Sequence, residues 1–346
     1  MIISAIVIVA YTTLGGFLAA STTDFIQSII MSVALIVVLI FGVETAGGIG
    51  AVIHNASELP GYLSMTLSYD VNTGKAAPYS ALTIVSTAAW GLGYFGMPHI
   101  LLRFMAIEDE KKLKLSRRVA TIWVVISLFV AVFIGVIGYT MSKVGALEML
   151  TGSNSETIIV KISALLSQHG VIFALLAGVI LAGILASTMS TSDSQLLAAS
   201  SAVSSDILGA FRKDSSNKNG SMAAARITLL VISVVAAFIA RNPDSSVFAI
   251  VSFAWAGFGA AFGPVVLFSL FWKRTNKWGA LAGMVCGGSM VFIWKYLIRP
   301  LGGIWNIYEL LPAFLIACAA IVIVSLLTPK PSKEIEEEFD RVAQMK

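Results

Sequence analysis

The sequence predicts an all-α, polytopic membrane protein. Of its 346 residues, 57% are hydrophobic and only 12% are charged, whereas roughly a quarter of the residues in soluble domains are charged. Apolar runs of about 20 residues, the length that a helix needs to cross a bilayer, recur along the chain. The net charge of +4 does not indicate a nucleic-acid partner, because the basic residues lie in short segments beside the apolar runs.

About nine membrane-spanning segments are expected, and the first is short. They cover Ile2 to Phe17, Phe25 to Val43, Tyr79 to Phe104, Val119 to Met141, Val171 to Ser201, Ala223 to Ala240, Val247 to Trp272, Trp278 to Ile298 and Trp305 to Leu327. The first run begins at Met1 without the charged n-region of a signal peptide, so we expect the end of a helix that starts upstream. The segment GGFLAASTTD is expected to turn between the first two spans.

Basic residues predict the orientation of the spans. The connection 108–118 holds five Lys and Arg residues, the densest basic cluster of the chain, and the positive-inside rule places it in the cytoplasm. Two further basic loops then fall inside, at Arg212, Lys213 and Lys218 and at Lys273, Arg274 and Lys277. Loops 42–78, 142–170 and 241–246 fall outside. We expect a transmembrane domain over 1–328, in the cell membrane, and a cytoplasmic tail over 329–346 that is either a solvated helix or disordered.

The run from Leu181 to Ser201 carries hydroxyl groups in the middle of an apolar helix. Ser187, Ser190, Thr191 and Ser194 are spaced i, i+3, i+4 and i+7, so a helix places them in one stripe. In hydrocarbon such a stripe must face other helices, a water-filled cavity or an ion. Hydroxyls of this kind also commonly bond back to their own helix or pack between helices, and the spacing alone favours that alternative.

The motif WGLGYFGMPH, from Trp90 to His99, predicts a broken membrane helix. Its three glycines and one proline weaken the helical hydrogen-bond ladder at membrane depth, and secondary transporters build binding sites at such breaks. Trp90, Tyr94 and Pro98 are spaced i, i+4 and i+8, so one side is expected to carry an aromatic wall. The glycines also satisfy GxGxxG, but no strand precedes them, which excludes the dinucleotide-binding interpretation.

Three segments together resemble one known family. They are YTTLGGFLAASTTDFIQ from Tyr11, WGLGYFGMPHILLRFMAI from Trp90 and LASTMSTSDSQLLAASSAVSSDI from Leu185. They resemble the sodium:solute symporters, most closely the sodium/proline members. The resemblance implies a five-plus-five inverted-repeat transporter fold, N-terminally truncated here so that the chain begins near the end of the fourth core helix. The missing first core helices would then be partners of this chain.

The resemblance also implies a substrate site and two sodium sites. Trp90, Tyr94 and Pro98 match positions that line the proline site, although Met97 stands where proline symporters have Gln. The residues expected to hold sodium are, for the first ion, Ser190 and Thr191 with the carbonyl of Ser187 and, for a second ion, Asp24, Asp193 and Ser194. Asp193 is itself a departure, because small polar residues are usual there.

The function expected from these features is sodium-coupled symport of a small amino acid, with proline first, by alternating access. Alternatives are another small organic solute or a truncated, non-transporting remnant. An intramembrane aspartyl hydrolase using Asp24 and Asp193 is disfavoured, since no glycine-flanked aspartate motif is present, and the chain is expected not to be an enzyme. Asp24 has a competing role as a helix cap after Ser21, Thr22 and Thr23. Trp90 and Tyr94 have competing roles as packing aromatics or as part of an aromatic belt at the level of the lipid headgroups.

Overall fold

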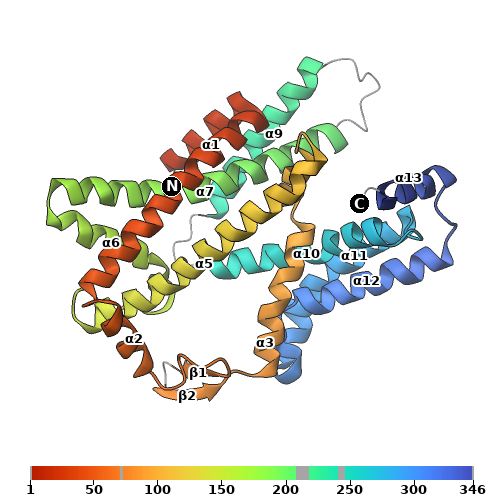
Figure 1. The fold of residues 1–346 in the computed structure, drawn as a ribbon. Coiled ribbons are helices and arrows are strands. Elements are labelled where there is room, and N and C mark those ends of the chain that lie inside the picture. The colour runs from red at the N-terminus through yellow and green to blue at the C-terminus, as the bar shows by residue number, and fades with distance from the viewer. Residues whose placement is uncertain (1, 71–72, 208–217, 241–245, 345–346) are drawn as a thin grey trace. The chain divides into compact units, whose positions relative to one another are not determined.

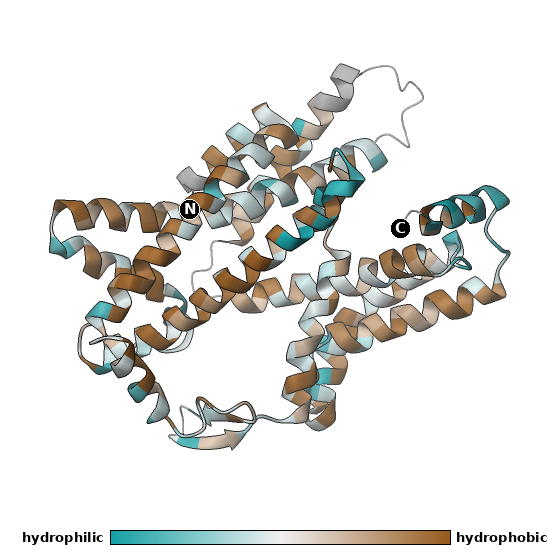
Figure 2. Cartoon of the chain, in the orientation of Figure 1, coloured by the Kyte–Doolittle hydropathy of each residue, from teal (hydrophilic) through white to brown (hydrophobic). Residues whose placement is uncertain are grey.

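The computed structural model describes residues 2–70, 73–207, 218–240 and 246–344, and these are helical almost throughout. The chain forms two compact units. Unit 1 comprises Met1–Leu63, Tyr69–Ala76 and Ile107–Ser245, and unit 2 comprises Ser64–Ser68, Ala77–Ala106 and Ser246–Lys346. In the described part of the chain, six helices are long and apolar enough to cross a membrane, and a shorter apolar helix covers Ala223–Ile239. Figure 2 shows these helices as largely brown, apolar ribbons.

Unit 1 is built around two long helices that pack along each other, α1 (Ile2–Thr45) and α7 (Val171–Ser201). Its other helices are α2 (Ile49–Ser57), α5 (Leu113–Lys143), α6 (Ile158–Leu166) and α9 (Lys218–Ile239). The core between α1, α5, α6 and α7 is aliphatic, with Ile137, Ile162 and Ile180 fully buried. A Cβ on Gly183 would lie 2.7 Å from the Cβ of Ala34, so glycine is what allows α7 to approach α1 this closely.

Unit 2 packs three helices around a broken one. These are α10 (Val247–Phe271), α11 (Lys277–Ile293) and α12 (Leu310–Leu327), and the broken helix consists of α3 (Ala81–Ala88), the 3₁₀ segment η1 (Ala89–Gly96) and α4 (Pro98–Met105). Gly279, Gly283 and Gly287 repeat every four residues on α11. A Cβ on Gly283 would lie 2.4 Å from Ile321 of α12, so the two helices pack through this glycine stripe.

Short elements connect the helices. A two-stranded hairpin is formed by β1 (Leu67–Asp70) and β2 (Lys75–Pro78). The π-helical turn η5 (Ala202–Ile207) extends α7, and η6 (Trp294–Ile298) extends α11. The remaining 3₁₀ turns are Glu110–Lys112, Gly152–Thr157, Ser167–His169, Arg299–Leu301 and Gly303–Asn306.

The C-terminal tail contains a helix, α13 (Lys333–Gln344), the strongly hydrophilic teal segment of Figure 2. It is acidic, and its Asp340 carboxylate accepts from the Lys273 ammonium at 2.5 Å. Of the two alternatives for the tail, the helix is therefore the observed one, held to the loop between α10 and α11.

Several expected boundaries hold and others are wrong. The span Val171–Ser201 is confirmed at both ends by α7. The expected break between the first two spans is confirmed, but it is shorter than the segment GGFLAASTTD: two helices within α1 meet at Gly16, which has φ 58° and ψ −153°. Helix resumes directly after Gly16, so Asp24 lies inside the second of these helices and its expected role as a cap is wrong. The last span begins at Leu310 rather than Trp305. Arg212, Lys213 and the loop 241–245 lie outside the described residues, as does the side chain of Lys218.

Candidate ion and substrate sites

The break in the helix of unit 2 follows from its sequence. Pro98 occupies the first turn of α4, and a residue before proline is driven out of the helical region; Met97 accordingly has φ −83° and ψ 110°. The carbonyl of Trp90, inside η1, is satisfied from outside the segment by the Trp255 indole Nε1, which donates to it at 3.0 Å. The predicted broken helix is confirmed, and α10 supplies a partner for its freed backbone.

Glycines bring η1 against α10 backbone to backbone. A Cβ on Gly96 would lie 2.3 Å from the carbonyl oxygen of Phe258, and one on Gly259 would lie 2.6 Å from the Cα of Gly93. A Cβ on Gly93 would meet the Trp255 ring at 2.0 Å. The glycines therefore have a packing role in addition to weakening the helix.

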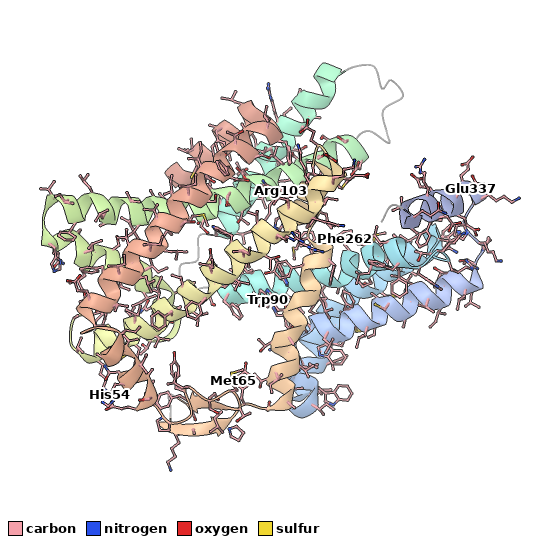
Figure 3. The ribbon with its side chains drawn as sticks, viewed as in Figure 1. His54, Met65, Trp90, Arg103, Phe262 and Glu337 are labelled. Atoms are coloured by element: carbon pink, nitrogen blue, oxygen red, sulfur yellow. The ribbon has the colours of Figure 1, made fainter. Side chains whose placement is uncertain are left out.

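Trp90 is surrounded by parallel rings. Its ring centroid lies 5.5 Å from that of Phe248, 5.7 Å from that of Trp255 and 5.9 Å from that of Tyr308, with interplanar angles below 20°. Tyr94 meets Trp255 edge to face at 4.8 Å and is 47% exposed. Figure 3 marks Trp90 on this segment. The structure thus gathers Trp90 and Tyr94 around Trp255.

The expected one-sided wall of Trp90, Tyr94 and Pro98 does not form as reasoned. The i, i+4, i+8 argument needs 3.6 residues per turn, whereas η1 has three, and Pro98 belongs to the next helix. Met97, where the sequence departs from the proline members, is 3% exposed. Met97 therefore packs inside unit 2.

Tyr308 anchors the same aromatic group and was not found from the sequence. Its backbone N–H donates to Ser86 Oγ of α3 at 3.1 Å, and its hydroxyl donates to the Ser252 carbonyl of α10 at 2.6 Å. The Tyr308 hydroxyl therefore acts as a donor that ties this residue to α10. The partners of Tyr308 are distant in sequence, and no local pattern points to them.

In unit 1, the hydroxyl stripe of α7 bonds to its own helix. Ser190 and Thr191 both donate to the Ser187 carbonyl, at 3.2 and 3.3 Å, and Ser194 donates to the Ser190 carbonyl at 2.9 Å. A packing role would give the same bonds. However, a hydroxyl that gives its proton to the backbone turns its lone pairs outward, which suits a cation. Ser187 and Thr191 are exposed within this chain, whereas Ser194 is buried.

Asp193 lies in a buried polar cluster rather than in solvent. Its carboxylate is fully buried and accepts from the Tyr11 hydroxyl of α1 at 2.8 Å; the Ser194 hydroxyl, whose one proton is shared with the Ser190 carbonyl, lies 3.2 Å from its Oδ1. Tyr11 is also within electrostatic reach of Asp24. The three residues expected at a second ion, Asp24, Asp193 and Ser194, thus belong to one region between α1 and α7. Tyr11 and Gln27 were not found from the sequence, although a glutamine in the apolar run FIQSIIMSVALIV was a signal.

Comparison with known proteins establishes the family. The model of the sodium:solute symporter family matches residues 1–287. The chain belongs to the sodium:solute symporter family. This confirms the resemblance read from the three sequence segments.

Similar proteins in this family are named as proline transporters. The chain is 38% identical over 333 residues to the osmoregulated proline transporter OpuE of Bacillus subtilis, and 40% identical over 339 residues to the sodium/proline symporter of Haemophilus influenzae. Each match covers 96% of this chain and 64% of the relative. The chain therefore spans a little under two thirds of the length of these relatives.

A solved structure has the same fold. It is a Na⁺-coupled sialic acid symporter in a substrate-bound outward-open state, with a TM-score of 0.72 and 18% identity over 95% of this chain and 66% of that one. At this identity the likeness shows the fold alone. It confirms the expected all-α, polytopic transporter fold.

Proposed function

We propose that the protein couples the inward movement of a small amino acid, proline first, to sodium, by alternating access in the cell membrane. The observation that carries the proposal is the near 40% identity to proline transporters over almost the whole chain. The relatives are transporters, which supports transport over the aspartyl hydrolase alternative. The basic connection 108–118 supports a cytoplasmic tail.

In this proposal, α7 holds the first sodium ion through the hydroxyls of Ser190 and Thr191 and the carbonyl of Ser187. Their protons point to the helix backbone, and sodium takes oxygen ligands as other hard cations do. A second sodium ion is proposed at Asp24, Asp193 and Ser194. The segments present in the relatives beyond this chain are proposed to complete both the sodium and the solute sites.

The solute site is proposed at the broken helix, with Tyr94 as the open aromatic contact and Pro98 at the start of α4. Trp90, which stacks on Trp255, is proposed to line the solute site as well. Proline is kept as the first solute to test, because Met97, which replaces the Gln of the proline members, is buried inside unit 2. For coupling, the ion must bind one conformational state better than the other.

The test is uptake of labelled proline by the full-length protein in proteoliposomes under an inward sodium gradient. We expect uptake in the parent, its loss with Ser190→Ala combined with Thr191→Ala, and full activity with Thr188→Ala. Thr188 is a matched control because it also bonds back to its helix, at Ile184, but lies off the stripe. Uptake of another small solute in place of proline would correct the substrate. No sodium-driven uptake of any solute by folded protein would favour the non-transporting remnant.

A further inference from the structure

Gln27 is a buried polar side chain on α1 with an incomplete set of hydrogen bonds. It is only 9% exposed, and its Oε1 atom is buried and has no hydrogen-bond partner among the described residues. Buried amide oxygens are nearly always paired, and at membrane depth an unpaired one is costly. The position therefore calls for a ligand that offers a proton or a positive charge.

The neighbouring Tyr11 determines which way the Gln27 amide points. The Tyr11 hydroxyl donates to Asp193 Oδ2 at 2.8 Å, and the Gln27 side chain lies beside the same hydroxyl. A phenol has a single proton, which Asp193 already receives, so the oxygen of Tyr11 presents lone pairs to Gln27 and favours its amide N–H₂ over its amide oxygen. Reversing the amide would place its oxygen against these lone pairs. Oε1 is therefore held on the side away from Tyr11.

Carboxylate oxygens lie in the same region. Asp24 precedes Gln27 by three residues, so both lie on one face of α1, and Tyr11 is within electrostatic reach of both Asp24 and Asp193. Asp193 is fully buried. The region between α1 and α7 therefore combines oxygen ligands of two kinds, amide and carboxylate, which are those that hard cations prefer.

We propose that Gln27 Oε1 is a direct ligand of the sodium ion held between α1 and α7, together with Asp24 and Asp193. Tyr11 is the positioning residue, because its hydroxyl donates to the Asp193 carboxylate and presents its lone pairs to the Gln27 amide. The inference rests on the proposed function, in which the coupling ion is sodium. It adds a neutral ligand and its orienting group to that site.

The experiment measures sodium binding and transport separately in the full-length protein. Binding is followed by the rise in melting temperature of purified protein as sodium replaces choline, and transport by sodium activation of proline uptake. Gln27→Met keeps the length of the side chain and removes its oxygen. We expect it to raise the half-saturating sodium concentration roughly 10-fold in both assays, as for loss of one bond to a charged group. Ser28→Ala, next on α1, half-buried and with its hydroxyl bonded to the Phe25 carbonyl of its own helix, is the matched control and is expected to match the parent.

Two further variants separate a ligand from a packing residue. Gln27→Glu keeps an oxygen at the site and is expected to bind sodium at least as tightly as the parent. This variant still tests the inference if Gln27→Met does not fold. Tyr11→Phe is expected to raise half-saturating sodium about 10-fold, as for loss of a group that orients ion ligands, with the proline KM at saturating sodium unchanged. Half-saturation within twofold of the parent in Gln27→Met, or weakened sodium binding in Gln27→Glu, would overturn the inference.

The outcomes also separate this inference from the proposed function. Sodium-driven proline uptake that is insensitive to Gln27→Met would refute the role of Gln27 and leave symport standing. Conversely, a parent that takes up no proline, but whose stabilisation by sodium is lost in Gln27→Met, would refute proline symport and support the ligand.

Discussion

Replacing Gly96 by alanine tests the packing of the broken helix directly. The added Cβ would lie 2.3 Å from the Phe258 carbonyl oxygen and 2.8 Å from the Gly263 nitrogen. Both are backbone atoms of α10, so no side-chain rotation relieves the contact, and η1 must move about 1 Å to reach ordinary contact distance. Overpacking of this kind costs about 1–3 kcal/mol. We expect a melting midpoint lower by several degrees and reduced proline uptake, since the same segment carries Tyr94.

Gly91 provides the control within the same segment. A Cβ there meets nothing within 4 Å, so Gly91→Ala is expected to be neutral or to stabilise by about 0.5–1 kcal/mol through the lower entropy of the unfolded chain. Melting curves of the purified full-length protein, read beside uptake, measure both variants. Equal effects of Gly91→Ala and Gly96→Ala would refute the reasoning, because helix propensity alone treats the two positions alike.

Three other predictions follow from contacts within one unit. Trp255→Phe removes the donor to a carbonyl of η1 and is expected to cost about 1–3 kcal/mol, measured as a lower melting midpoint; a midpoint equal to the parent's would contradict it. Lys273→Ala is expected to release α13, seen as faster amide exchange in α13, with the same effect from high salt in the parent. Hydrogen bonding to Asp340 raises the pKa of Lys273, so the charge that Lys273 brings to this contact is complete below about pH 10.5 and is lost as pH rises through the higher folded value. Lys143 lowers the pKa of Glu58, chiefly by hydrogen bonding, so stability from this pair is present above about pH 4.5 and is lost as pH falls through the lower folded value. Lys143→Met and the parent should therefore differ in melting midpoint at pH 7 and converge in acid, and a pH-independent difference would count against the pair.

Helices of this protein can be predicted from the sequence where the length of an apolar run sets the ends of the helix. The span Val171–Ser201 matches α7 at both ends, because Gly170 with φ 110° precedes a continuous apolar run. The turn expected over Gly15 to Asp24 is confined to a break at Gly16, because Thr22 and Thr23 donate to carbonyls one helical turn back, at Leu18 and Ala19. Away from water, this back-bonding satisfies the hydroxyls without ending the helix.

The candidate sites were predictable only in part. The broken segment and the stripe of α7 carry local signals, in glycine, proline and hydroxyl spacing. The partners of the broken segment and of α7 carry no local signal, because Trp255 contacts Trp90 across 165 residues and Tyr11 contacts Asp193 across 182. Tertiary packing selects such pairs, and neither propensity nor periodicity encodes them in one sequence.

The two proposed ion sites divide α7 by its helical geometry. Ser187 and Thr191 are exposed, whereas Asp193 and Ser194, further along the helix axis, are buried, and Asp193 is bonded to Tyr11 of α1. Ser190 lies between them: its hydroxyl belongs to the first site, and its carbonyl accepts from Ser194 of the second. An ion between α1 and α7 therefore acts on the same turn of helix that presents the first site. If both sites bind sodium, occupation of one should tighten the other, because each stabilises the same arrangement of that turn.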